Sequence, residues 1–201
     1  MVPGTDRVPG MLVDMPSTFT RDELLAAAGR LLPDVLVPGL DVLLCGINPG
    51  LWSAATGHHF ARPGNRFWPA LHRSGFTPRQ LRPDEQDLLP TWGLGITNLA
   101  ARATARADEL TRAELTEGAA ILRAKVADYA PRWLAVLGVT AYRTAFGIQG
   151  AKVGPQESTA LAPTRLWILP NPSGLNAHYQ LADLAEEFGR LREASGAGQR
   201  G

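Results

Sequence analysis

The chain has 201 residues, of which 45% are hydrophobic and 19% charged, and its formal net charge is +1. These values are typical of one globular domain with a substantial core, and they lack the overall basicity of a protein that coats nucleic acid. No apolar stretch approaches the roughly 18 residues of a membrane span, and no secretory leader is recognisable. The single cysteine fits a reducing compartment. We therefore expect a cytoplasmic protein with no membrane partner.

The first segments predict an arm, a helix and a buried strand. Residues 1–20 carry Pro, Gly, Ser and Thr without apolar periodicity, and we expect a flexible N-terminal arm there. Leucines at helical spacing predict a helix over residues 22–32. The apolar run over residues 42–47 is bounded by turn residues and is typical of a buried strand. A polar, glycine-bearing loop is expected over residues 48–65.

The rest of the chain alternates between helical and strand patterns. The pattern predicts a helix through residues 67–72, a strand over 93–99, a helix over 111–129, a strand over 133–138, a helix over 141–146, a strand over 165–170 and a closing helix over 179–192. Such alternation implies parallel strands with helices on both faces of the sheet. We therefore predict an α/β fold with three layers, α/β/α, around a central and mainly parallel sheet of four to five strands. It would form a single domain over residues 21–192, followed by a disordered tail over 193–201.

Two of the predicted strands end in the same dipeptide. The run "DVLLCGINPG" ends in Asn48-Pro49-Gly50, and "RLWILPNPSGLN" continues into Asn171-Pro172. Parallel α/β sheets bind ligands beyond the carboxyl ends of their strands. If the strands over 42–47 and 165–170 lie near the centre of the sheet, the two Asn-Pro loops face each other across one cleft.

The amide of Asn48 suits some kinds of chemistry and excludes others. It offers one acceptor and two donors but has no usable pKa, so it can orient a water or bond a planar base edge and cannot act as a general base. Gly46 and Gly50 allow a ligand to approach the backbone closely. The alternative is that Asn-Pro-Gly forms a turn and nothing more.

Two apolar residues lie in these polar loops. Phe60 could present a stacking face to a nucleobase, or it could pack on the core. Leu175 follows Ser173 and Gly174, whose N–H groups allow close approach, and an apolar tip of this kind can wedge into a base stack. Leu175 could equally anchor the helix that follows it.

Other chemistries have less support. One Cys and four scattered His residues provide no zinc-type cluster, so we expect no metal. A nucleotide- or nucleoside-handling enzyme that binds phosphate at the Asn48 loop would be expected to carry a lysine-bearing phosphate loop, which is absent. A non-catalytic DNA-binding module is the third alternative.

Three motifs in one order carry a family resemblance. "GINPG", "FARPGNRFW" and "LPNPSGL" resemble the mismatch-specific uracil-DNA glycosylases, bacterial relatives of thymine-DNA glycosylase within the uracil-DNA glycosylase superfamily. The similarity extends from about residue 36 to about residue 192. It implies a DNA-repair glycosylase that flips uracil from G·U-type mismatches in double-stranded DNA, with thymine and exocyclic cytosine adducts as alternative substrates. Hydrolysis of the N-glycosidic bond would leave an abasic site and would need neither metal nor organic cofactor. We expect the protein to act as a monomer.

The resemblance also implies roles for particular residues. Asn48 would orient the attacking water at C1′ of the sugar. Ser53 would lie near C5 of the base, and Phe60 would stack on the flipped uracil. The base pocket would be formed by Gly46, Ile47, Ser53, Phe60 and Asn98.

The second loop would hold the DNA. Leu175 would fill the gap left by the extruded base, while backbone atoms of Gly174 and Asn176 would contact the widowed guanine. The DNA-binding residues implied are Asn171, Ser173, Gly174, Leu175 and Asn176.

One stretch departs from the family pattern. Relatives carry "VDRPT" after the second strand, whereas residues 100–104 read "AARAT" here. The carboxylate of that motif is replaced by Ala101, and Asn98 is the nearest polar candidate. We therefore expect no acidic helper for Asn48 at this position.

Overall fold

The computed structural model describes residues 18–157 and 161–198 of the chain. Most of the predicted N-terminal arm lies outside these residues. Its last residues make contacts: the ring of Phe19 meets Trp52 edge-on, with centroids 5.1 Å apart. The hydroxyl of Thr20 caps the first helix by accepting from the backbone N–H of Glu23.

The centre of the molecule is a five-stranded sheet of order β2-β1-β3-β5-β4. The strands are β1 (Val42–Gly46), β2 (Leu94–Asn98), β3 (Trp133–Leu137), β4 (Gly154–Gln156) and β5 (Arg165–Leu169). All neighbours pair in parallel except β4, which runs antiparallel at one edge. The predicted mainly parallel sheet is therefore confirmed. β4 was not predicted, because a segment of three residues that includes Gly and Pro shows no strand alternation.

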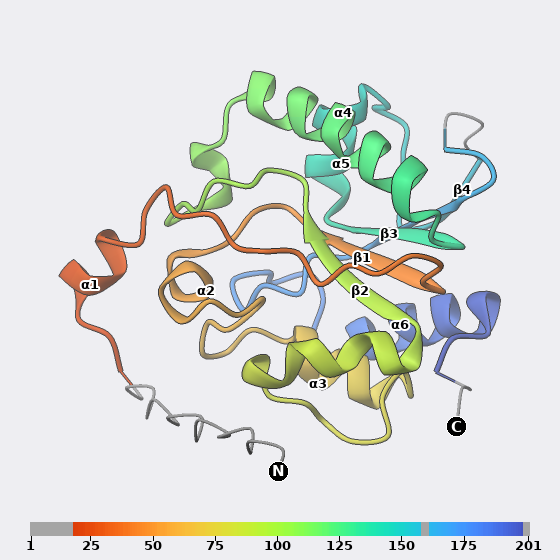
Figure 1. Cartoon of the computed structure of the whole chain (residues 1–201), viewed down its shortest axis with the longest axis horizontal. Coiled ribbons are helices and arrows are strands. Elements are labelled where there is room, and N and C mark those ends of the chain that lie inside the picture. The colour runs from red at the N-terminus through yellow and green to blue at the C-terminus, as the bar shows by residue number, and fades with distance from the viewer. Residues whose placement is uncertain (1–17, 158–160, 199–201) are drawn as a thin grey trace, which may run out of the picture.

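Helices cover both faces of the sheet, so the predicted three-layer architecture is confirmed (Figure 1). Helices α4 (Arg112–Tyr129) and α5 (Val139–Phe146) lie on one face, and α3 (Phe67–Arg73) and α6 (Leu181–Ser195) lie on the other. Successive strand side chains point to opposite faces. In β1, Leu43 packs with the first helix pair and Leu44 with the second. Two buried faces explain why the strands read as continuous apolar runs.

The predicted helix over residues 22–32 was wrong in extent. Helix α1 covers only Arg21–Leu25, and the chain then turns through Gly29 at a φ of +76°. Leu31, counted in the apolar face of that prediction, is 72% exposed and forms a β-bridge with Arg102. Pairing with the segment after β2 therefore replaces the continuation of the helix.

The predicted loop over residues 48–65 and the connection between α3 and β2, for which no element was predicted, both contain helical structure. Residues 48–65 include α2 (Leu51–Thr56), and the connection between α3 and β2 contains the 3₁₀ stretch η1 (Pro83–Trp92). A shorter 3₁₀ turn, η2 (Ala107–Glu109), precedes α4. Within the part of the chain that the structure describes, no helix is both long enough and apolar enough to cross a membrane.

The predicted tail begins too early. Helix α6 continues past residue 192 to Ser195, and Ala197 is fully buried after the cap at Gly196. Ser195 and Ala197 are both buried, and Ala197 belongs to the core cluster, so the chain packs against the core beyond residue 192. Residues 199–201 lie outside the described range.

Helix α4 touches the end of β2 at Gly118. This glycine is buried, and a methyl group built on it would collide with the carbonyl oxygen of Leu99. The close approach matters for the site described below, because Leu99 leads directly into residues 100–104. In α6, Gly189 is also helical but has open space around the equivalent position.

Gly118→Ala is expected to lower the free energy of unfolding by about 1–3 kcal/mol, because overpacking outweighs the better helix propensity of alanine. Gly189→Ala is the matched control and is expected to raise it by about 0.5–1 kcal/mol. Urea unfolding followed by circular dichroism measures both. Equal effects of the two substitutions would show that the contact at Leu99 is not tight.

Candidate active site

A cleft of about 690 Å³ opens at the carboxyl ends of the strands. β1 and β5 flank β3 in the sheet, so the loops that follow them border the same cleft, as the sequence predicts. The predicted site residues that line it are Gly46, Ile47, Asn48, Ser53, Phe60, Asn98, Asn171, Ser173, Leu175 and Asn176. Gly174 is the one predicted site residue outside this lining, and it lies against another loop instead.

Gly138 separates the two Asn-Pro loops at the end of β3. Its φ is +129°, a conformation that side chains other than that of glycine rarely adopt. A Cβ atom there would lie 3.2 Å from Cδ1 of Ile47 and 3.9 Å from Cβ of Asn171. The absence of a side chain thus leaves room for both loops along the cleft.

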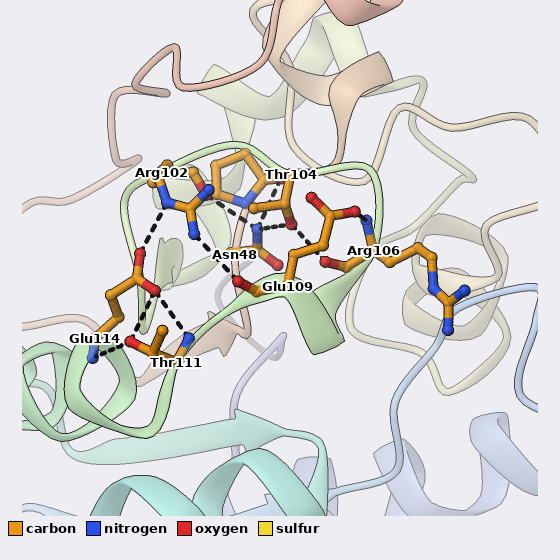
Figure 2. Close-up of polar contacts among 8 residues, drawn as sticks. Asn48, Arg102, Thr104, Arg106, Glu109, Thr111 and Glu114 are labelled. Atoms are coloured by element: carbon orange, nitrogen blue, oxygen red, sulfur yellow. Dashed lines mark hydrogen bonds and ion pairs between the residues drawn. The ribbon is translucent and has the colours of Figure 1, made fainter.

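The side chain of Asn48 is held at one end and free at the other (Figure 2). Its Nδ2 donates to Oγ1 of Thr104 at 2.7 Å, to the carbonyl oxygen of Arg102 at 3.0 Å and to that of Pro49 at 3.1 Å. Carbonyl oxygens only accept hydrogen bonds, so the amide nitrogen must face them. No group among the described residues donates to Oδ1, which is left as an acceptor on a half-buried side chain that lines the cleft.

The residues that hold Asn48 are themselves held by hydrogen bonds, and Arg102 is bonded to the start of α4. Oγ1 of Thr104 donates to the carbonyl oxygen of Arg106 at 2.7 Å, so its lone pair is turned to the amide of Asn48. Nε of Arg102 donates to Glu114 at 2.8 Å, and Glu114 also closes the capping box with Thr111 (Figure 2). Hydrogen bonds from the Arg102 guanidinium and from Thr111 lower the pKa of Glu114 to about 2, so it is ionised at neutral pH.

The 100–104 segment therefore provides Asn48 with a hydroxyl and a carbonyl oxygen, and it contains no carboxylate. Among the described residues that line the cleft, the one carboxylate is Asp108, which is exposed and ion-paired with Arg106. No group of three or more His, Cys, Asp or Glu side chains in the described part of the chain is placed to hold a metal ion. Thr104 was not among the predicted site residues, although it matches the threonine that ends the "VDRPT" motif.

Phe60 forms part of the wall beside Gly46. Its ring stacks on that of Phe67, with centroids 3.9 Å apart and planes 18° apart, and the half-buried residue also lines the cleft. Phe60 therefore packs on the core and also lines the cleft. Its φ is +54°, and such a backbone conformation in a bulky residue costs roughly 1–3 kcal/mol. Ser53 supports the turn, because its Oγ accepts from the N–H of Ala61 at 3.3 Å.

A buried histidine sets the orientation of Asn98. His59 is 1% exposed, and its Nε2 lies 2.9 Å from the carbonyl oxygen of Pro33, which only accepts hydrogen bonds, so Nε2 carries the proton. Burial lowers the pKa of His59, which leaves Nδ1 as an acceptor for Nδ2 of Asn98 at 3.4 Å. Oδ1 of Asn98 then lies beside Gly46, 2.5 Å from where a Cβ would be, so only glycine fits there. His59 was not a predicted site residue.

Two amides of the 171–179 loop shape the loop itself. Oδ1 of Asn171 accepts from the N–H of Ser173 at 3.0 Å, and Nδ2 of Asn176 donates to the carbonyl oxygen of Asn171 at 2.9 Å. Leu175 stands at the apex with 72% of its surface exposed, so it does not anchor the helix that follows. A Cβ on Gly174 would lie 2.6 Å from the carbonyl oxygen of Gly64, which brings two loops into backbone contact.

A comparison with protein families agrees with this architecture. The sequence model of the uracil DNA glycosylase superfamily matches residues 33–193, a range that contains the whole sheet, both Asn-Pro loops and all the residues that line the cleft except Leu32. Proteins of this superfamily are DNA glycosylases, hydrolases that act on uracil in DNA. The chain belongs to the uracil DNA glycosylase superfamily.

Proposed function

We propose that the protein excises uracil from G·U mismatches in double-stranded DNA and leaves an abasic site. The observation that carries the proposal is the amide of Asn48, whose nitrogen is held by three acceptors while its oxygen remains available in the cleft. Superfamily membership supports the DNA glycosylase activity, and the three sequence motifs support the mismatch-specific type.

The chemistry of an amide determines the mechanism. Oδ1 of Asn48 accepts a hydrogen bond from a water and directs its oxygen toward C1′, but it cannot take up the proton. The C1′–N1 bond therefore breaks largely before the water adds, and its electron pair leaves with the base. Positive charge develops on the sugar, and the water proton passes to solvent after the new C–O bond forms. The rate depends on positioning, a source of large effects in enzymes.

The other wall of the cleft binds the base. The ring of Phe60 stacks on the flipped uracil, a contact worth about 1–3 kcal/mol that tolerates base identity. The contact with His59 turns Oδ1 of Asn98 toward Gly46, where it can accept a hydrogen bond from N3–H of uracil. Neutral cytosine lacks this donor. Gly46 and Ile47 line the same pocket, and hydrogen bonds to the departing base stabilise the charge that develops on it. Ser53 lies near C5, where thymine carries its methyl group.

A mismatch is favoured by the energetics of flipping. Extrusion of a base costs a few kcal/mol, and the cost is least where the pairing is weak. Leu175 enters the stack and fills the gap, while the backbone of Gly174 and Asn176 contacts the widowed guanine. We propose double-stranded DNA as the partner and a monomer as the form that binds it.

Uracil release from a duplex with a single G·U pair is expected for the wild type and is measured by alkaline cleavage at the abasic site. Asn48→Ala should lower the single-turnover rate at least about 100-fold, because the water loses its orienting acceptor. Binding of the duplex should be retained, since Asn48 does not carry the DNA contacts. Binding without release by the wild type would instead identify a non-catalytic DNA-binding module.

Thr104→Val keeps the shape of the side chain but removes the hydroxyl that holds Asn48. We expect a fall of about tenfold in the single-turnover rate at saturating enzyme, with unchanged affinity for the duplex, because only the orientation of the amide is disturbed. Thr116→Val is the control, since its hydroxyl bonds the carbonyl oxygen of Arg112 on the exposed side of α4. Wild-type rates in Thr104→Val would show that Asn48 needs no such support.

Leu175→Ala should slow release from the G·U duplex about tenfold or more. It should have a smaller effect when uracil faces a base-free site, because no pair must then be broken. Ile121→Ala, which truncates another exposed apolar side chain (51% exposed), is the control on α4. Equal effects of Leu175→Ala on both duplexes would refute the wedge role.

A further inference from the structure

Arg66 reaches from the start of α3 to the loop that carries Leu175. Its Nη1 donates to the carbonyl oxygen of Tyr179 at 2.6 Å. Its Nη2 donates to that of Asn176 at 2.8 Å and also to that of Ser173. The backbone N–H of Arg66 donates to the carbonyl oxygen of Pro172 at 3.0 Å. One residue thus bonds four points of a loop more than 100 residues away in the sequence.

The guanidinium is suited to this contact and is committed to it. Its donors form a rigid planar fork, whereas a lysine presents a single flexible ammonium. The carbonyl groups of residues 173, 176 and 179 lie on both sides of the apex at Leu175. The terminal nitrogens of Arg66 therefore bind protein backbone, and Nε is buried without a partner in the structure.

The same short segment supports the wall that faces the base. Gly64 lies in backbone contact with Gly174, and Oδ1 of Asn65 accepts from the N–H of Phe67 at 2.9 Å. Phe67 in turn stacks beneath Phe60. Residues 64–67 thus connect the stacking wall of the cleft to the loop that presents Leu175.

We propose that Arg66 is a positioning residue that holds the apex of the 171–179 loop in the conformation needed for Leu175 to enter the base stack. The inference rests on the proposed function. Ordering a loop on binding costs conformational entropy, and a loop that is already braced avoids that cost. Because residues 64–67 also place Phe67 under Phe60, the brace fixes the wedge relative to the surface on which the extruded base stacks.

Arg66→Lys tests the proposal, because it keeps the positive charge and removes the fork. On the G·U duplex the single-turnover rate should fall at least about tenfold, since small errors of position have large effects on rate. On a duplex in which uracil faces a base-free site, the rate should change less than about threefold, because extrusion there is cheap. Retained activity on this second duplex also shows that the variant is folded.

Arg190→Lys is the matched control, because Arg190 lies on α6 and pairs with Glu187. It should leave both rates unchanged. The fluorescence of 2-aminopurine placed beside uracil reports extrusion independently of bond cleavage, and its rise should be slower in Arg66→Lys than in Arg190→Lys.

A double-mutant cycle with Leu175→Ala identifies the route of the effect. If Arg66 acts through Leu175, adding Arg66→Lys to Leu175→Ala should lower the single-turnover rate on the G·U duplex by less than about a further threefold. In the otherwise wild-type protein, Arg66→Lys should lower the same rate about tenfold. The positioning role would be overturned if the rate losses of the two single variants multiplied in the double variant. It would also be overturned if Arg66→Lys lowered the rates on the two duplexes equally.

The outcomes also separate this inference from the proposed function. A wild-type protein that releases no uracil would refute the proposed activity, and the fluorescence assay would still test Arg66. Wild-type rates in Leu175→Ala would refute the wedge role and the positioning role together. Impaired Leu175→Ala with unimpaired Arg66→Lys would refute the positioning role alone.

Discussion

The fixed orientation of the Asn48 amide is the constraint on which the rest of the site depends. A carboxylate or imidazole can contribute through its pKa, but an amide can contribute only through its position. The structure meets this demand with acceptors at the nitrogen end, two of them from residues 102–104. That segment is anchored in turn to the capping box of α4 through Glu114. The start of a long core helix therefore stabilises the position of the proposed catalytic side chain.

The cleft also requires that neighbouring side chains and loops can lie close to the backbone at the strand ends. Gly46 leaves space for Oδ1 of Asn98 and the edge of the Phe60 ring, and Gly138 leaves space between the two Asn-Pro loops. Both glycines end central strands or follow them directly. The parallel sheet brings strand ends to one edge, and the missing side chains allow their loops to share a binding surface.

The two walls of the cleft are connected structures. Phe60 keeps a strained backbone conformation because Phe67 and Ser53 support its turn. Arg66, next to Phe67, reaches the opposite loop and bonds its backbone on both sides of the exposed apex. A rigid stacking surface and a braced apolar tip suit a protein that must hold a base outside the helix while it closes the gap inside.

The sequence alone determined the features that depend on local pattern. Apolar runs predicted the four longer strands, their alternation with helices predicted the three layers, and matching Asn-Pro ends predicted one cleft between two loops. Local pattern gave a wrong prediction where a segment pairs with a distant part of the chain. A helix was expected over residues 22–32, but its second half pairs with the segment after β2.

Only the tertiary structure decided how the side chains of the site are held. Thr104 lies 56 residues from the Asn48 amide that it binds, and Tyr179 lies 113 residues from Arg66. His59 is a neighbour of Phe60 in sequence, yet its effect on Asn98 depends on a carbonyl group of Pro33. Hydrogen bonds between such distant segments exist only after the sheet has brought them together, so no spacing of residue types along the chain could have revealed them.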